Sequence, residues 1–280
     1  MISYLVSLIS IFAIATMSLA AYFDIRTREV PDFISYLMVT GGLSINLAIS
    51  ITSGSILNLE FLPLAILLLF GFSYLMYRSG QWGGGDVKLM LGLSMIFTAG
   101  DLFSHFSFIA LFINMLIFGG LYGIVGTVVY GLAKIKKLYR FLKIYDILLV
   151  GVGAAAITLI VLYIPAPFSF LIAFSAFLLV SMRYIYIVAQ NLMFIDTSVN
   201  KLTEGDWLAD DVKDGSGKII VKRRQTGLLL EDIKKLKDHG VKTVLIKIGL
   251  PFVPGLLAGV VITVVIGNPL LHLVVLNTGL

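Results

Sequence analysis

The sequence contains no cysteine, which excludes disulfide bonds, thiol catalysis and zinc sites built on cysteine. Histidine is nearly as scarce, and the three histidines are too scattered to indicate a histidine metal site: His105, His239 and His272. Charged residues make up only 13% of the chain and 59% of the residues are hydrophobic, whereas a soluble domain is about 25% charged. The composition therefore predicts a polytopic membrane protein and excludes a soluble globule.

Eight apolar segments approach or exceed the length of a membrane-spanning helix, which requires about 20 apolar residues. The first has no basic residue in front of it, so we interpret it as a transmembrane helix rather than a cleaved signal peptide. The fourth is short for a span and is expected to tilt. The predicted spans are 2–23, 33–51, 59–77, 87–99, 106–133, 147–164, 168–189 and 248–275.

The positions of lysine and arginine predict the sidedness of these spans, because cytoplasmic segments carry an excess of basic residues. With the N-terminus placed outside, the outside connections contain no lysine or arginine; they are 52–58, 100–105, 165–167 and the C-terminal tail. The inside segments hold Arg26, Arg28, Arg78, Lys88, the run 134–143 and the block after residue 196. We therefore predict a multi-pass cell-membrane protein with both termini outside. This rule also explains the net charge of +5, so no nucleic-acid partner is expected.

Residues 196–247 are polar and hold 11 of the 21 basic residues. The stretch GDWLADDV, DGSG and KIIVKRR is typical of a hairpin, because Asp-Gly favours a tight turn. GLLLEDIKKLKDHG indicates a short amphipathic helix that ends at Gly240, and KTVLIKIG indicates another strand. We therefore predict three regions: a transmembrane catalytic core (1–195), a small cytoplasmic α+β insert (196–247), and a final transmembrane helix with an extracellular tail (248–280).

Five of the seven acidic residues outside this insert lie at the predicted inner membrane boundary, and the other two, Glu60 and Asp101, are predicted outside. The five are Asp24, Glu29, Asp32, Asp86 and Asp146. Ionisable groups at membrane depth are costly and therefore indicate function. Asp32 and Asp146 stand where helix N-caps are expected, and Glu29 lies in a basic loop where it is solvated or paired. Asp86 also stands at an N-cap position, but capping does not explain the three glycines before it. Glycine allows close backbone approach and positive φ, as an extended peptide lying against a catalytic acid requires.

Asp24 and Asp86 together have the chemistry of a peptide-hydrolysing pair. Two neighbouring carboxylates do not ionise together easily, so they share one proton. The ionised acid takes a proton from water while the other donates to the carbonyl oxygen, and the roles reverse as the amine leaves. Spacing alone leaves other interpretations open: an interfacial anchor at Asp24, a helix cap at Asp86, or a transporter in which both acids bind a cation or relay protons.

Two motifs carry a resemblance to a known family. DIRTREVPD, which begins at Asp24, resembles the segment of type IV prepilin peptidases in which an aspartate after the first helix is followed by Pro-Asn or Pro-Asp. GGGDVKLM resembles their second segment, glycine-any-glycine-aspartate followed by lysine, at Gly83, Gly85, Asp86 and Lys88. The insert and the segment PFVPGLLAG resemble the archaeal preflagellin and prepilin peptidases in particular.

The resemblance implies a membrane aspartic endopeptidase of the Gly-x-Gly-Asp type, with Asp24 and Asp86 as the catalytic residues and no metal or cofactor. Its implied substrates are archaellin or type IV pilin-like precursors, which lose a short basic leader at the cytoplasmic face of the bilayer. Gly83, Gly85 and Lys88 are expected to support the site or bind substrate; Lys88 either orients Asp86, binds a backbone carbonyl, or snorkels. Three acids of the insert offer a basic leader an attractive surface, unless they are simply solvated: Asp206, Asp210 and Asp211.

Three other functions compete with this one. A relative of presenilin or signal-peptide peptidase also uses Gly-x-Gly-Asp, but there both acids lie late in the chain, whereas Asp24 closes the first span here. An ion- or proton-coupled transporter that uses Asp24 and Asp86 is expected to show related halves, and no second glycine-aspartate segment matches the first. The third alternative is a scaffold whose insert docks partner proteins.

Overall fold

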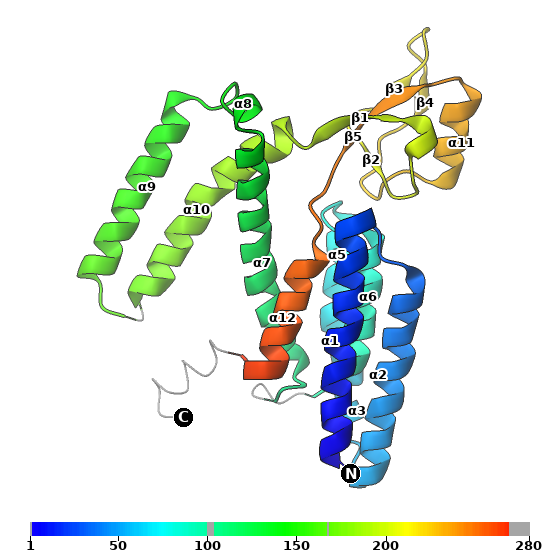
Figure 1. The fold of residues 1–280 in the computed structure, drawn as a ribbon, viewed down its shortest axis with the longest axis vertical. Coiled ribbons are helices and arrows are strands. Elements are labelled where there is room, and N and C mark those ends of the chain that lie inside the picture. Colours follow the sequence, from blue (N-terminus) through cyan, green and yellow to red (C-terminus); the bar gives the residue numbers. More distant parts are fainter. Residues whose placement is uncertain (1, 100–103, 167, 269–280) are drawn as a thin grey trace.

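The computed structural model describes residues 2–99, 104–166 and 168–268 (Figure 1). Among these residues, five helices are long and apolar enough to cross a membrane, while Leu62–Arg78 and the last helix are shorter. The predicted class, a polytopic helical membrane protein, is therefore confirmed. The main helices are α1 (Ile2–Thr27), α2 (Asp32–Ser53), α5 (Gly71–Arg78), α6 (Gly84–Ile96), α7 (Phe108–Ala133), α9 (Ile144–Tyr163), α10 (Phe168–Asn191) and α12 (Val253–Ile266).

Two of the predicted spans differ in detail from the structure. The third starts with a separate short helix, α3 (Leu57–Glu60), is interrupted at Phe61, and then runs as one helix over Leu62–Arg78. This helix consists of α4 (Leu62–Ala65), the π-helical η1 (Ile66–Phe70) and α5. The last span was predicted from residue 248, yet α12 begins at Val253, because Gly249 and Pro251 favour non-helical backbone in front of it. The predicted end of this span at residue 275 lies outside the described residues.

The membrane helices form two packed groups, joined side by side (Figure 1). The N-terminal group is made by α1, α2, α5 and α6, and α12 packs between it and α7, while α9 and α10 form a separate antiparallel pair. Small residues allow the closest approach: a Cβ on Gly92 of α6 would lie 2.6 Å from the Met38 Cβ of α2. The buried core of this group draws on α1, α2, α6, α7 and α12, and its largest members include Met17, Met38, Leu89, Phe97 and Phe108.

The insert folds as a small α+β unit at one end of the N-terminal group (Figure 1). Its three-stranded antiparallel sheet has the order β1 (Phe194–Ser198), β5 (Thr243–Lys247), β2 (Trp207–Leu208), with Phe194 paired to Lys247. The amphipathic helix α11 (Leu230–Asp238) covers this unit, and Leu236 is fully buried in its core. Strand β1 follows α10 and β5 precedes α12. Because β1 and β5 pair, the two points at which the chain leaves and re-enters the membrane region lie next to each other.

Most elements of the insert agree with the sequence. The hairpin is formed by β3 (Val212–Lys213) and β4 (Ile219–Val221), with a turn in which Asp214 accepts a hydrogen bond from the backbone N–H of Ser216. The helix ends before Gly240, whose φ of 69° only glycine adopts easily. The segment KTVLIKIG contains β5, as predicted. Strand β1 was not predicted, because it continues directly from the end of α10 with no turn signal between them.

Candidate active site

Asp24 lies in the last turns of α1 with only 8% of its surface exposed. Its Oδ2 accepts a hydrogen bond of 2.9 Å from the backbone N–H of Val253, the first residue of α12. The carbonyl of Asp24 accepts the N–H of Arg28, and Arg28 ends the helix at a φ of 60°. Asp24 is therefore fixed by the start of a helix that lies 229 residues further along the chain.

Asp86 is the third residue of α6, not its N-cap. Its Oδ2 folds back and accepts a hydrogen bond of 3.0 Å from the backbone N–H of Gly83, which precedes the helix. None of the three glycines before Asp86 has a positive φ; Gly83 is extended and the next two are already helical. The expectation of positive φ there is wrong. A Cβ added to Gly83 would lie 3.5 Å from the Asp86 Oδ2, which is an ordinary van der Waals contact.

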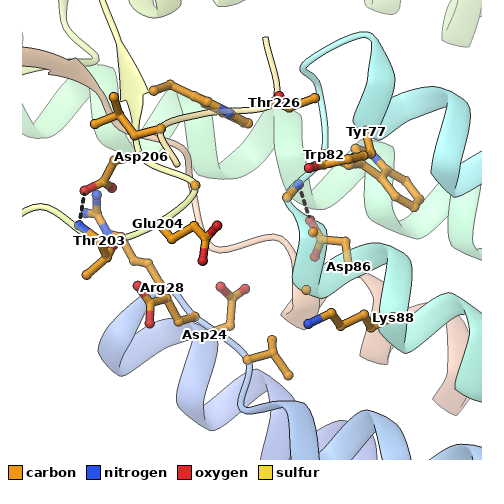
Figure 2. Close-up of a pocket in the computed structure, with 18 of the residues that line it drawn as sticks. Asp24, Arg28, Tyr77, Trp82, Asp86, Lys88, Thr203, Glu204, Asp206 and Thr226 are labelled. Atoms are coloured by element: carbon orange, nitrogen blue, oxygen red, sulfur yellow. Dashed lines mark hydrogen bonds between the residues drawn. The ribbon is translucent and has the colours of Figure 1, made fainter. Parts of the chain in front are cut away.

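Both acids line one cavity of about 520 Å³ at the end of the N-terminal group where the insert lies. Figure 2 shows the carboxyl groups of Asp24 and Asp86 directed into the same space from opposite walls. One wall is the end of α1 and the loop to α2, and the other is the loop between α5 and α6 with the start of α6. The structure thus brings together the two acids that were predicted as a pair.

Lys88 lies in the same cavity but does not contact Asp86. Its Nζ forms an ion pair of 2.5 Å with Oδ1 of Asp32, and both side chains are about half exposed. Asp32 is the first residue of α2, and Pro31 takes the N-cap position without a side-chain cap bond. The predicted N-cap role of Asp32 is therefore wrong. Lys88 joins α6 to α2 instead of orienting Asp86 directly.

The remaining boundary acid, Asp146, belongs to a different part of the membrane region. It is the third residue of α9, where its Oδ2 accepts the backbone N–H of Lys143. Its Oδ1 accepts a hydrogen bond of 2.8 Å from Nε of Arg183 on α10. Asp146 therefore caps its own helix from an inner position and also ties α9 to α10.

The insert supplies a further wall of the cavity through its loop 203–206 and through residues 226–229. Asp206 lies in this wall, whereas Asp210 and Asp211 do not line the cavity. Burial raises the pKa of Asp206, the backbone N–H of Thr203 opposes this shift, and the charge of Glu29 adds to it. Asp206 was predicted from the sequence, whereas Glu204, which also lines the cavity, was not. Nothing in the sequence distinguishes Glu204 from other acidic residues in loops.

The cavity is acidic overall, since its lining contains six carboxylates and two basic side chains. Within the described part of the chain, no three acidic or histidine side chains converge as a set of metal ligands. The acids are Asp24, Glu29, Asp32, Asp86, Glu204 and Asp206, and the bases are Arg28 and Lys88.

A second cavity of about 530 Å³ adjoins the first on its membrane side. It lies between α5, α6 and α7, and most of its lining is apolar. Trp82 lines both cavities and packs at 5.2 Å between ring centroids against Phe252, which also lines the second one. Gly120 and Gly123 of α7 line it too, and a Cβ added to either glycine would meet no atom within 4 Å. We refer to the first cavity as the acidic cavity and to the second as the apolar groove. The two meet at Trp82.

Comparison with known proteins gives one result. Residues 11–124 match the type IV leader peptidase family, and this range contains both Asp24 and Asp86. No curated protein and no solved structure matches the chain. The matched range runs from α1 into α7, so it includes two of the walls of the acidic cavity. This multi-pass membrane protein is therefore similar to the type IV leader peptidase family over 114 of its 280 residues.

Proposed function

We propose that the chain is an aspartic endopeptidase of the Gly-x-Gly-Asp type, and that Asp24 and Asp86 are its catalytic residues. The observation that carries this proposal is that the two acids, 62 positions apart and on different helices, line one cavity. Asp24 is nearly buried, and each carboxyl group is held by a backbone N–H. Such a fixed pair is suited to acid–base chemistry, because the catalytic groups need not be reorganised during the reaction.

The reaction that follows from this pair is hydrolysis of a peptide bond. One carboxylate removes a proton from water as the water oxygen bonds to the scissile carbonyl carbon, and the protonated acid donates its proton to the carbonyl oxygen. In the second step the C–N bond breaks, the amine nitrogen takes up the proton that came from water, and the carbonyl re-forms as its oxygen returns the other. Both acids end as they began, so neither is consumed.

The substrates of this peptidase are precursors of pilin-like proteins, archaellins included, and the product is the precursor without its basic leader. The charge of the acidic cavity supports this substrate, since six acidic and two basic side chains line it and its net charge stays negative with one proton shared by Asp24 and Asp86. The apolar groove supports it as well, because it continues from the acidic cavity at Trp82. We assign the groove to the hydrophobic helix that follows the leader, so that the scissile bond lies between the two cavities.

The cleavage takes place at the cytoplasmic face. This sidedness rests on the insert, which contributes a wall of the cavity and holds 11 of the 21 basic residues of the chain. The N-terminus of α1 lies at the other end of its helix bundle (Figure 1) and is therefore outside.

Purified full-length protein incubated with a pilin-type precursor tests this proposal. The product is identified by its mass and its new N-terminus. We expect Asp24→Asn and Asp86→Asn each to lower the cleavage rate by about 10²- to 10⁴-fold, the usual contribution of a positioned acid or base. Glu60→Gln, which changes an exposed acid on α3 far from the cavity, serves as the control. Cleavage that persists in either folded aspartate variant would refute the assignment.

A further inference from the structure

The loop 203–206 of the insert is held firmly over the two aspartates. Oδ2 of Asp206 accepts the backbone N–H of Thr203 at 2.8 Å, which closes the loop on itself. Two backbone hydrogen bonds of 2.8 Å, from Gly205 N–H to the Leu228 carbonyl and from Leu228 N–H to the Asp206 carbonyl, tie the loop to the next segment of the insert. The side chains of this loop are therefore presented to the cavity in a defined position.

The acids of the cavity are mostly left without a basic partner. Among the described side chains that line it, Lys88 and Asp32 form the one ion pair. Removing that pair leaves five acidic side chains facing a single guanidinium, that of Arg28. Because Asp24 and Asp86 share one proton in the proposed mechanism, these five acids carry four negative charges. Carboxylates confined in one cavity repel each other, so the field inside it attracts a cation.

Glu204 is the acid of the insert best placed to bind such a cation. Its side chain is exposed, and Figure 2 shows it directed into the space that Asp24 and Asp86 also face. Asp206 lies further out in the same wall, beside Thr203 and toward Arg28 (Figure 2). Asp24 faces the same space: its nearly buried carboxyl group lines the cavity while its Oδ2 accepts the Val253 N–H, so a leader side chain bound by Glu204 lies close to the proposed catalytic pair.

We infer that Glu204, assisted by Asp206, is a specificity residue that binds a lysine or arginine side chain of the leader and so positions the scissile bond against Asp24 and Asp86. This inference rests on the proposed function, which it extends to the insert. The insert is then part of the substrate-binding site rather than a docking module. Neither residue takes part in the bond-breaking steps, so both act on substrate binding.

A panel of precursors that differ only in the leader tests this role in the full-length protein. One precursor carries lysine in the leader, and in the other two these lysines are replaced by glutamine or by glutamate. The variants are Glu204→Gln, Asp206→Asn and their combination; asparagine at 206 retains an oxygen that can accept the Thr203 N–H. Asp210→Asn is the matched control, since Asp210 is an exposed acid of the same insert outside the cavity.

We expect the double variant to cleave the lysine precursor with a kcat/KM about tenfold lower, through KM, as is usual when partly exposed charge pairs are lost. The glutamine precursor should change less than about twofold, so the preference for a basic leader disappears. Glu204→Lys should restore cleavage of the glutamate precursor, an effect that a merely structural role for Glu204 does not produce. Asp210→Asn should behave as the unmodified protein.

The outcomes separate the two proposals. If the unmodified protein cleaves none of the precursors, the proposed function fails and the leader-binding role fails with it. If it cleaves them in an Asp24- and Asp86-dependent way, but the double variant keeps the full preference for lysine over glutamine, the proposed function stands and the role of Glu204 is refuted. The same holds if Asp210→Asn reduces the preference as much as the double variant does.

Discussion

Filling the apolar groove beside the aspartates should block binding of the hydrophobic part of the proposed substrate without contacting the proposed catalytic residues. Gly123 lies on α7 in the wall of this groove, and a Cβ at this position meets no atom within 4 Å. Gly123→Leu therefore projects an apolar side chain into the groove of about 530 Å³ with no clash at its Cβ. Leucine also has a higher helix propensity than glycine, so α7 should not lose stability.

The size of the effect follows from the burial that the substrate loses. The new leucine occupies the space of one apolar substrate side chain, and burial of a leucine-sized side chain is worth about 1.5 to 3 kcal/mol. Since about 1.4 kcal/mol corresponds to a factor of ten in affinity, the KM for a full precursor should rise by about 10- to 100-fold. The kcat at saturating precursor should change little, because Asp24 and Asp86 keep their hydrogen bonds to Val253 and Gly83.

Initial rates over a range of precursor concentrations in detergent micelles separate KM from kcat. Gly151→Leu is the matched control: Gly151 is a helical glycine on α9 that also has no atom within 4 Å of a Cβ, but it lies outside the groove. A second substrate that ends shortly after the scissile bond should be cleaved equally by both variants. If Gly123→Leu leaves KM unchanged, or raises it equally for the truncated substrate, the groove does not hold the hydrophobic helix.

Two further predictions concern the insert. Gly227→Ala should destabilise the insert by about 1 to 3 kcal/mol or more, because φ at Gly227 is 87° and the new Cβ would lie 2.2 Å from the Gly205 carbonyl oxygen. Gly215→Ala should be tolerated, because a Cβ on Gly215 meets no atom within 4 Å. Hydrogen exchange of the insert's backbone amides measures both effects. Acidification should weaken the preference for a lysine over a glutamine leader, because Asp206 loses its charge as the pH falls through a pKa raised by burial and by Glu29. The loss should therefore begin at a higher pH than for a free aspartate, whose pKa is about 3.9, and Asp206→Asn should flatten the profile of the two-leader ratio. A ratio that does not change with pH, or that changes equally in the variant, contradicts this.

Hydrophobic patterning predicted the membrane helices well because their apolar length is itself the determinant of spanning. It was least accurate where local backbone chemistry interrupts an apolar run. The third span is interrupted at Phe61, just before the helix that contains Pro63, and α12 starts late, after Pro251. Hydropathy continues at both places but the helix does not, because the ring of Pro63 clashes with a helical carbonyl four residues before it and Pro251 disfavours helical backbone at Leu250.

The two aspartates were identifiable because each lies in a short motif with a defined place relative to the spans. Their partners were not. The hydrogen bond from Val253 to Asp24 joins residues 229 positions apart, and no local signal marks a backbone N–H as a ligand for a distant carboxyl group. Glu204 was missed for a similar reason, since only the tertiary arrangement distinguishes it from Asp210 and the other exposed acids of the insert.

The way the two acids are held argues against assigning their roles from helix ends. Asp24 lies near the C-terminal end of α1, where the helix dipole alone would favour a neutral acid, yet its carboxyl group meets the N-terminus of α12. Asp86 likewise receives an N–H at the N-terminus of its own helix. Since each carboxyl group accepts an N–H at the N-terminal end of a helix, helix position alone does not distinguish the proposed acid from the proposed base. Only five residues separate β5 of the insert from α12, so the insert that supplies the proposed leader-binding wall is closely connected to the Val253 N–H that holds Asp24.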